Sequence, residues 1–121
     1  VFILNDNQAD GRDVSWIWDA HMEIINEIKP SLIIASGIRA NDMLLRIKYS
    51  IGEIFKMSND SYITKDKDMK IIKVDEIKNI HKKLLSYLKN NKLESDEIFV
   101  LPTYTAMLEF RKYLLGEALD D

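Results

Sequence analysis

Side chains that can bind ligands are concentrated just after the first apolar run of the chain. The stretch NDNQADGRDVSWIWD, residues 5–19, holds four aspartates, two asparagines, an arginine and two tryptophans. Carboxylates and amides can hydrogen-bond to a nucleotide or a polar substrate, whereas tryptophan is enriched where proteins bind one another. This stretch is therefore the first candidate for a functional site.

For some polar residues of this stretch, a structural role is the alternative to ligand binding. Asp13 comes directly before a predicted helix that begins at Val14, where a carboxylate accepts hydrogen bonds from unpaired backbone amides. We interpret Asp13 as a helix cap. Asp6 follows the first strand directly, and a structural and a ligand-binding role are equally open for it. Arg12 can pair with the neighbouring carboxylates or bind a phosphate, and the sequence does not choose between these.

The two tryptophans fall on opposite faces of the helix predicted from Val14. Trp18 lies in a stripe of apolar residues at helical spacing, so we expect it in the core. His21 lies in the same stripe, and we expect it to be a packed histidine and not a catalyst.

Trp16 points to the opposite face of that helix, together with Asp19 and Glu23. A tryptophan is costly to leave in water and is typical of interaction hot spots. We therefore expect Trp16, Asp19 and Glu23 to lie in a protein interface. The alternative is that another segment of the same chain covers Trp16.

Strands alternate with helices along the chain. Apolar, β-favouring runs predict strands over 1–4, 31–36, 53–57, 69–74 and 97–101, with a polar loop over 58–68. Periodic apolar stripes predict helices over 14–29, 40–50, 75–91 and 105–116. Pro30, Pro102 and Gly116 are expected to end the elements that precede them. This alternation predicts a three-layer, Rossmann-like α/β fold with a mainly parallel sheet.

Three strand-to-helix crossings carry hydrogen-bonding side chains where plain turn residues would be enough. They are NDNQADGRD (5–13), SGIRAND (36–42) and LPTYTA (101–106). Ligands bind open parallel sheets at the carboxyl ends of the strands, so the three crossings predict one functional edge. Arg39, Thr103, Tyr104 and Thr105 are the candidate binding residues of the second and third crossings.

Composition restricts the class of protein. A chain of 121 residues with 46% hydrophobic content is expected to form one domain over 1–121. The net charge of −3 argues against nucleic acid as a partner. The absence of cysteine excludes disulfides and fits the cytoplasm, and no apolar run is long enough to span a membrane. Because the chain opens directly on strand residues, we expect a piece of a longer protein.

Several familiar chemical motifs are absent. The sequence contains no G-x-x-x-x-G-K-[ST], G-x-G-x-x-G or G-x-S-x-G motif, so another domain must supply any phosphate loop. Its two histidines do not have the spacing of a metal site. The lysine-rich stretch from Lys65 to Lys92 is interrupted by acidic residues and is expected to be a solvated face.

The motifs ILNDNQADGRDVSWIWD, SGIRANDMLLRIKYS and LPTYTAMLEFRKYL closely resemble the carboxyl-terminal domain of the MurT-type subunit of lipid II isoglutaminyl synthase, a relative of the Mur ligases. The resemblance covers essentially the whole chain. It implies a fold of the Mur ligase C-terminal domain type and a role in peptidoglycan biosynthesis.

The resemblance also implies an activity and partners. Such a subunit acts with a GatD-type glutamine amidotransferase, which hydrolyses glutamine with a cysteine and a histidine. The ammonia amidates the α-carboxylate of D-glutamate in the stem peptide of lipid II. ATP and Mg²⁺ are implied as cofactors, bound mainly by domains absent from this chain, so the isolated domain is expected to be inactive.

Individual residues acquire roles through the same resemblance. Asp19, the aspartate of WIWD, is the implied carboxylate that completes the partner's Cys-His pair, a sensible role because a carboxylate orients an imidazole and stabilises its charged form. Asp6 is the implied contact of the ATP ribose, and the residues near it are Asn5, Asn7 and Asp10. Gln8 stands where Mur ligases carry lysine, and the polar segment 58–70 is longer than the family pattern and has no assigned role.

A second hypothesis from a different class is a non-catalytic α/β module that docks a protein through Trp16. In that case the polar loops are only structural. Nucleotide-dependent behaviour of the intact protein would separate the two hypotheses.

Overall fold

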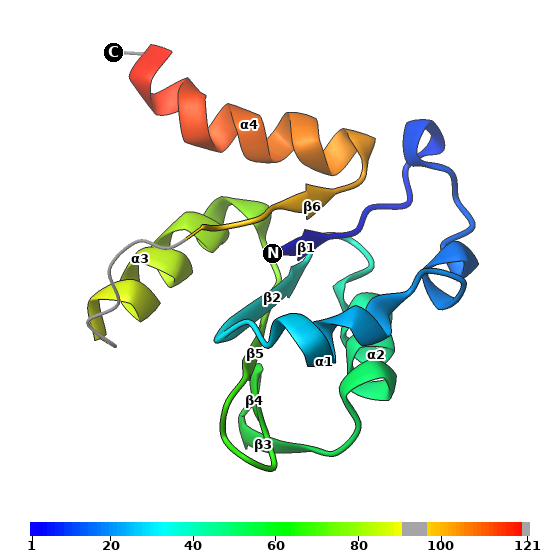
Figure 1. Cartoon of the computed structure of the whole chain (residues 1–121). Helices are drawn as coiled ribbons and strands as arrows, with labels where there is room; N and C mark the ends of the chain where they lie inside the picture. The colour runs from blue at the N-terminus through cyan, green and yellow to red at the C-terminus, as the bar shows by residue number, and fades with distance from the viewer. Residues whose placement is uncertain (91–96, 120–121) are drawn as a thin grey trace.

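A six-stranded sheet divides the molecule into three layers (Figure 1). The structure is a computed structural model and describes residues 1–90 and 97–119. The strands are β1 (Phe2–Ile3), β2 (Leu32–Ser36), β3 (Ile54–Ser58), β4 (Ser61–Thr64), β5 (Lys70–Val74) and β6 (Leu101–Pro102). The α-helices are α1 (Ile25–Ile28), α2 (Ala40–Ile51), α3 (Ile80–Asn90) and α4 (Tyr104–Leu119). Four 3-10 helices are η1 (Gln8–Asp10), η2 (Ser15–Trp18), η3 (Met22–Ile24) and η4 (Ile77–Asn79).

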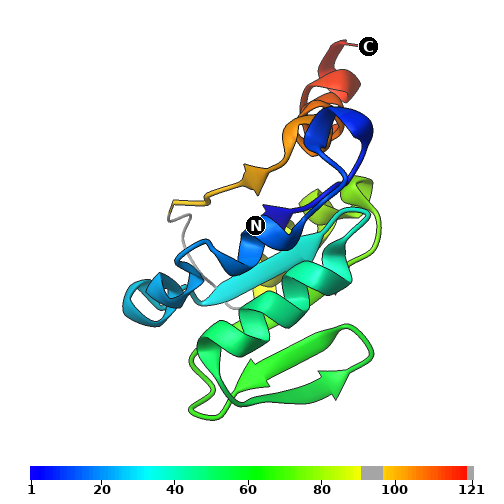
Figure 2. The same cartoon turned by 90° about the vertical axis from the view of Figure 1, so that its right-hand side faces the viewer.

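The strand order is β3-β4-β5-β2-β1-β6. The four strands β5, β2, β1 and β6 are parallel, whereas β3, β4 and β5 pair antiparallel. The predicted α/β fold with a mainly parallel sheet is confirmed. Figure 2 shows the β3–β4 hairpin at the edge of the sheet, below α2 in that view.

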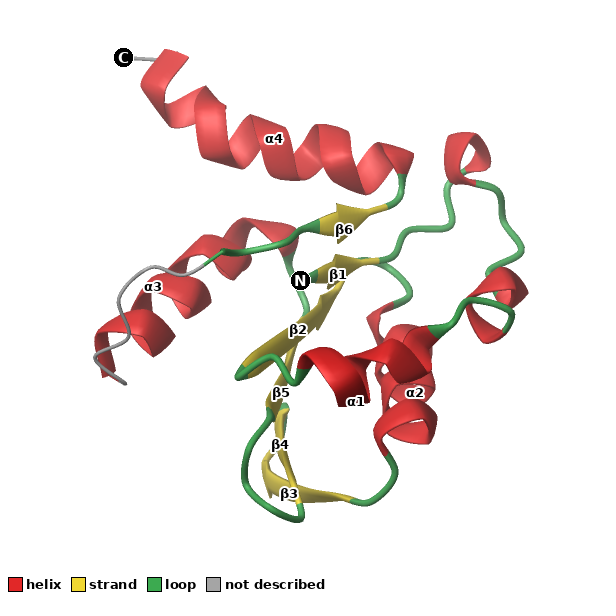
Figure 3. Ribbon diagram, viewed as in Figure 1, coloured by secondary structure: helices red, strands yellow, loops and turns green. Residues whose placement is uncertain are grey.

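The two faces of the sheet carry separate cores. Along β2, Ile33 and Ala35 face α1 and α2, whereas Ile34 faces α3 and α4. This alternation follows from the period of two in a strand, and burial on both faces explains why β2 is apolar throughout. Figure 3 shows the yellow strands between the two sets of red helices.

The loop predicted over 58–68 was partly wrong, because it contains β4. Tyr62 lies opposite Lys56 on β3 and Ile71 on β5. The four residues of β4 are flanked by charged and polar turns, which hid the strand in the sequence. Its two neighbouring strands satisfy its backbone hydrogen bonds.

The helix predicted over 14–29 was also wrong. It is broken into η2, η3 and the single turn α1. The expected end near Pro30 is confirmed: Lys29 has a left-handed φ of 50° directly after α1.

The carboxyl-terminal elements differ from their predicted bounds. Helix α4 continues through Gly116, so Gly116 does not end it. A glycine inside a helix costs only about 1 kcal/mol relative to alanine, which is too little to stop a helix by itself. The predicted strand 97–101 is reduced to Leu101–Pro102. Pro102 was expected to end this strand, but it is part of it and lies opposite Ile3 of β1. The N–H groups of Leu101 and Thr103 donate to the carbonyls of Val1 and Ile3, so the position of the missing N–H of Pro102 faces away from β1, at the sheet edge.

Within the part of the chain that the structure describes, no helix is long and apolar enough to cross a membrane. Residue 91, the last of the predicted helix 75–91, lies outside the described residues.

Candidate functional site

The three polar crossings meet at one edge of the sheet, and Asn5 joins them. Asn5 is 2% exposed. Its Oδ1 accepts a hydrogen bond from the backbone of Ile38 at 2.9 Å, in the second crossing. Its backbone N–H donates to Thr103 Oγ1 at 3.0 Å and its Nδ2 to Thr105 Oγ1 at 3.1 Å, in the third crossing. The predicted convergence of the crossings is thus confirmed.

Asp10 closes a second set of hydrogen bonds between the first and third crossings. Its carboxylate accepts from the backbone of Thr105 at 2.7 Å, from the Thr105 hydroxyl and from the backbone of Asn7 at 3.1 Å. Asn7 Nδ2 donates in turn to Thr105 Oγ1 at 2.9 Å. Desolvation raises the pKa of Asp10, but the bonds from Thr105 and Asn7 outweigh it and leave this pKa below its usual value. Asp10 is therefore engaged within the protein, where it holds the loop.

Gly37 allows the first two crossings to approach this closely. Its φ is +96°, and a Cβ at this position would lie 2.5 Å from the carbonyl oxygen of Leu4 and 2.9 Å from Asn5 Oδ1. Both values are below any real Cβ contact, so only glycine fits.

Asp6 and Arg39 form an ion pair at the same edge. Arg39 Nη1 donates to Asp6 Oδ2 at 3.0 Å, and Arg39 Nε donates to Asp42 Oδ2 at 2.7 Å. The bonds to Asp42 and Asp6 raise the pKa of Arg39, so it carries its charge at every pH of interest. The side chains of Asp6 and Arg39 keep 26% and 33% exposure, so both remain accessible to a ligand.

Arg12 and Tyr104 lie at the surface of this region. Tyr104 is 56% exposed at the start of α4. Arg12 is exposed and has no ion pair among the described residues. Both side chains lie at this edge of the sheet and are exposed there.

A small cavity opens beside Asn5, where the helices change sides of the sheet. The helices after β1 and β2 cover one face, and those after β5 and β6 cover the other, so β2 and β5 form a switch point. The cavity measures about 270 Å³, and its lining includes Asn5, Gly37, Ile38, Asp75, Glu76 and Glu109. The last three were not predicted, because only the topology brings them to this edge.

The tryptophan segment forms a second site, next to α2. Asp19 directly follows η2, and its N–H donates to the carbonyl of Trp16 at 3.0 Å. Both side chains are exposed, Trp16 to 49%. Asp13 Oδ1 accepts from the backbone of Ser15 at 2.9 Å, and this bond lowers the pKa of Asp13. The helix η2 begins one residue later than predicted, so Val14 and not Asp13 occupies its cap position.

Two predictions made for this segment were wrong. Trp18 is 46% exposed and not in the core, and the side chain of His21 is 75% exposed and not packed. Because the helix is broken, a wheel drawn through all of it places these side chains on the wrong face. Trp18 instead meets Tyr49 of α2 edge to face, with ring centroids 5.5 Å apart. Trp18 and Tyr49 thus form an exposed aromatic pair. Together with the exposed Trp16 of the same η2 they make up the aromatic surface of this segment, which Asp19 directly follows.

Arg46 of α2 holds this segment in place and was missed in the sequence. It is 4% exposed. Its guanidinium donates to the carbonyls of Ile17 and Ala20, both at 2.8 Å. It also donates to Glu23 at 3.1 Å and lies 5.3 Å from the centre of the Trp18 ring. The signal in the sequence was an arginine inside the apolar stripe of a helix.

The same contacts explain why the predicted helix is broken. In a continuous α-helix the carbonyl of Ile17 would accept the N–H of His21. Here Arg46 occupies that carbonyl, and the N–H of Asp19 bonds to Trp16 in a tighter turn. Glu23 also lies 3.6 Å from His21, and its hydrogen bonds, first from its own backbone and then from Arg46, lower its pKa.

Comparison with known proteins gives one family and its relatives. Residues 1–107 match the family model described as MurT ligase C-terminal. The lipid II isoglutaminyl synthase (glutamine-hydrolyzing) subunit MurT of Streptococcus pneumoniae is 33% identical over 117 residues, which is 97% of this chain and 22% of that protein. The subunit of the same name from Staphylococcus aureus strain COL is 46% identical over 54 residues, which is 45% of this chain and 12% of that protein.

The chain thus spans about a fifth or less of the curated relatives it matches. Its architecture, a sheet of mainly parallel strands with helices on both faces, agrees with a Mur ligase C-terminal domain. With a family match over residues 1–107 and a relative aligned over nearly its whole length, the chain belongs to the MurT ligase C-terminal family.

Proposed function

We propose that this chain is the carboxyl-terminal part of the ligase subunit of a glutamine-hydrolysing lipid II isoglutaminyl synthase. The main support is the relative from Streptococcus pneumoniae, which is 33% identical across 97% of this chain and is named as a subunit of such an enzyme. The complete enzyme would amidate the α-carboxylate of D-glutamate in the stem peptide with ammonia from a GatD-type glutaminase.

Asp19 is our candidate for direct participation in the glutaminase reaction. Its carboxylate would accept a hydrogen bond from the histidine of the partner's Cys-His pair, fix the tautomer of the imidazole and stabilise the imidazolium that forms. The proposal is supported by the exposure of Asp19 and by the rigid clamp of Arg46 on both sides of it. Trp16, Trp18 and Tyr49 would supply the apolar contact with the partner.

The edge around Asp6 is our candidate for the nucleotide. ATP would supply the activation of the substrate carboxylate as an acyl phosphate. The residues present fit the ribose end of that group: Asp6 is an accessible hydrogen-bond acceptor for hydroxyls, and Tyr104 is an exposed aromatic ring nearby in the third crossing. Asn5, Asn7, Asp10, Thr103 and Thr105 would hold the loop in shape.

The test uses the intact ligase subunit reconstituted with its glutaminase subunit. Asp19→Asn removes the negative charge while keeping the size of the side chain. We expect glutamine-dependent amidation to fall by about 10⁴-fold, the loss seen when the orienting carboxylate of a catalytic triad is replaced by an amide. Amidation with an added ammonium salt should remain, because this reaction bypasses glutamine hydrolysis.

Glu27→Gln, at an exposed acidic residue of α1, is the matched control and should leave both reactions unchanged. If Asp19→Asn leaves the glutamine-dependent rate at the wild-type level, the role of Asp19 is wrong. If neither glutamine nor ammonium supports amidation of lipid II by the unmodified enzyme, the proposed activity itself is wrong.

A further inference from the structure

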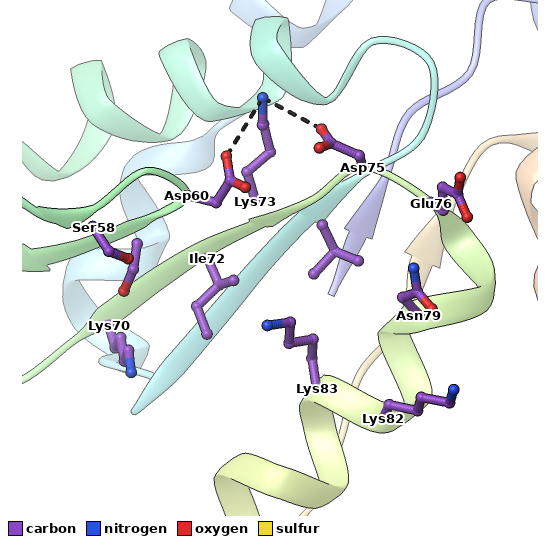
Figure 4. A pocket seen from close by; sticks show the side chains of 12 residues that line it. Ser58, Asp60, Lys70, Ile72, Lys73, Asp75, Glu76, Asn79, Lys82 and Lys83 are labelled. Atoms are coloured by element: carbon purple, nitrogen blue, oxygen red, sulfur yellow. Dashed lines mark ion pairs between the residues drawn. The ribbon is translucent and has the colours of Figure 1, made fainter.

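A second and larger cleft lies between the sheet and α3, away from the tryptophan segment (Figure 4). It measures about 610 Å³, within the usual range for a small-molecule site. Its lining comes from α3 and η4, from β5, and from the turn that joins β3 to β4. That turn lies in segment 58–70, which had no assigned role. None of the residues proposed for the nucleotide or for the partner lines it.

The acidic residues of the cleft are already paired with two lysines. Lys73 Nζ lies 3.4 Å from Asp75 and 3.7 Å from Asp60. Figure 4 shows these two ion pairs as dashed lines, on the side of β5 away from α3. Glu76 pairs with Lys78 at 3.2 Å. These three carboxylates and two lysines together carry a net charge of −1, so most of the negative charge of the carboxylates is compensated.

Three other lysines remain without such compensation. Lys70 of β5 and Lys82 and Lys83 of α3 border the cleft, and they have no ion pair with residues 1–90 or 97–119. The residues that line the cleft include four lysines and three acidic residues, a net charge of +1, whereas the whole chain carries −3. A cationic cleft in an acidic protein concentrates anions.

The remaining lining selects the kind of anion. Ser61 and Asn79 add neutral hydrogen-bond donors, and Ile72 of β5 contributes an apolar wall. Several ammonium groups together with hydroxyl and amide donors suit a phosphate better than a carboxylate as the bound anion. The reason is that a phosphate presents three or four acceptor oxygens, whereas a carboxylate presents two. The volume exceeds that of an inorganic phosphate and leaves room for a second phosphate or an ester group.

We propose that this cleft binds a phosphate-bearing ligand, either a diphosphate or a phosphate ester, through Lys70, Lys82 and Lys83. The bound group can belong to a soluble molecule or to a lipid headgroup, because the chemistry that recognises the phosphate is the same. The site is independent of the proposed role of Asp19.

The first experiment is calorimetric titration of the chain with inorganic pyrophosphate at low ionic strength. The triple variant Lys70→Gln, Lys82→Gln, Lys83→Gln should bind roughly tenfold or more weakly, since each exposed charge pair contributes up to about fivefold in affinity. The control variant Lys48→Gln, Lys65→Gln, Lys112→Gln loses the same charge at exposed lysines outside the cleft and should bind nearly as well as the wild type.

The second experiment identifies the source of the phosphate. The chain is sedimented with phosphatidylcholine vesicles that contain or lack phosphatidic acid. Binding that needs phosphatidic acid and is displaced by pyrophosphate indicates a lipid headgroup, whereas pyrophosphate binding without vesicle binding indicates a soluble ligand. The proposal fails if neither probe binds, or if the two triple variants lose affinity equally, because the attraction would then be a property of net charge alone.

Discussion

At the scale of single residues, the edge of the sheet is built by side chains whose polar atoms are used inside the protein. Asn5 is buried and bonds to both neighbouring crossings, while Asp10 accepts bonds from Asn7 and Thr105. A ligand-binding loop and a hydrogen-bonded clasp have the same composition, so the sequence alone does not separate the two roles. Asp6, Arg12 and Tyr104 keep the accessible polar groups.

Asp10→Asn should separate these two roles through its pH dependence. The pKa of Asp10 is lowered in the folded protein, so its contribution to stability is present above the unfolded pKa of about 4 and is lost as the pH falls through the folded value. We expect the variant to lower the unfolding free energy at pH 7 by roughly 1–2 kcal/mol, because an amide cannot accept all of these bonds. Urea unfolding at pH 7 and pH 3 checks this, and a difference that persists unchanged at pH 3 would contradict it.

Gly37→Ala tests the close approach of the first two crossings. The new Cβ would overlap the Leu4 carbonyl, and its φ is unfavourable for alanine, so we expect a loss of roughly 2–4 kcal/mol in the free energy of unfolding. Gly11 is the matched control: its φ is +86°, but nothing lies within 4 Å of its added Cβ. Gly11→Ala should therefore cost only about 1 kcal/mol by denaturant unfolding. Equal losses in the two variants would show that the contact with Leu4 does not matter.

At the scale of elements, the sequence predicted best where local pattern and packing agree. Strand β2 and helix α2 have near-continuous apolar stripes, and the structure places them within one residue of their predicted bounds. Helix α3 begins at Ile80, five residues after its predicted start, because the 3-10 helix η4 precedes it. Elements that depend on distant groups were missed. Strand β4 exists through two neighbouring strands, and the helix predicted from Val14 is broken by a guanidinium from α2.

The candidate site divides in the same way. The convergence of the three crossings followed from the rule for parallel sheets, and the exposure of Trp16 and Asp19 agreed with the prediction although the wheel used for it was wrong. Arg46 could not be assigned from the sequence, because two of its partners are backbone carbonyl oxygens, which every residue has. Asp75 and Glu109 needed the topology to reach the small cavity.

Arg46→Lys tests whether the tryptophan segment is held from α2. Lysine keeps the charge but cannot reach both carbonyls and Glu23 with one planar fork. We expect a loss of roughly 2–4 kcal/mol in the free energy of unfolding, as buried carbonyls and Glu23 lose their partner. Chemical denaturation measures this, with Lys48→Gln on the exposed side of α2 as the control. If the variant is as stable as the wild type, the contacts of Arg46 do not hold the tryptophan segment in place.

In the reconstituted enzyme, Arg46→Lys should also lower glutamine-dependent amidation while amidation from added ammonium persists. A purely structural role would lower both rates together through loss of folded protein. Folded protein is therefore quantified by circular dichroism before the two rates are compared.

At the scale of the whole molecule, the chain separates its surfaces by chemistry. The aromatic surface beside Asp19 lies with α2 on one side of the sheet, and the lysine-bordered cleft lies with α3 on the other. Exposed large aromatic groups close together are uncommon on a protein surface without a partner. Because the two surfaces lie on opposite sides of the sheet, a protein on one and a phosphate-bearing ligand on the other can be bound at the same time.

Trp16→Ala tests the aromatic surface as an interface with the glutaminase subunit. Trp16 is the cleaner choice, because Trp18 also packs on Arg46 and Tyr49 and its loss would disturb the segment itself. We expect the Kd of the two-subunit complex to rise about thirtyfold, which corresponds to roughly 2 kcal/mol, the usual size of a hot-spot effect. Phe55→Ala on the edge strand β3 is the control, since Phe55 is 47% exposed and Trp16 is 49% exposed. Calorimetry of the intact subunits measures both, and an unchanged Kd for Trp16→Ala, or an equal loss for Phe55→Ala, would exclude this surface as the specific interface.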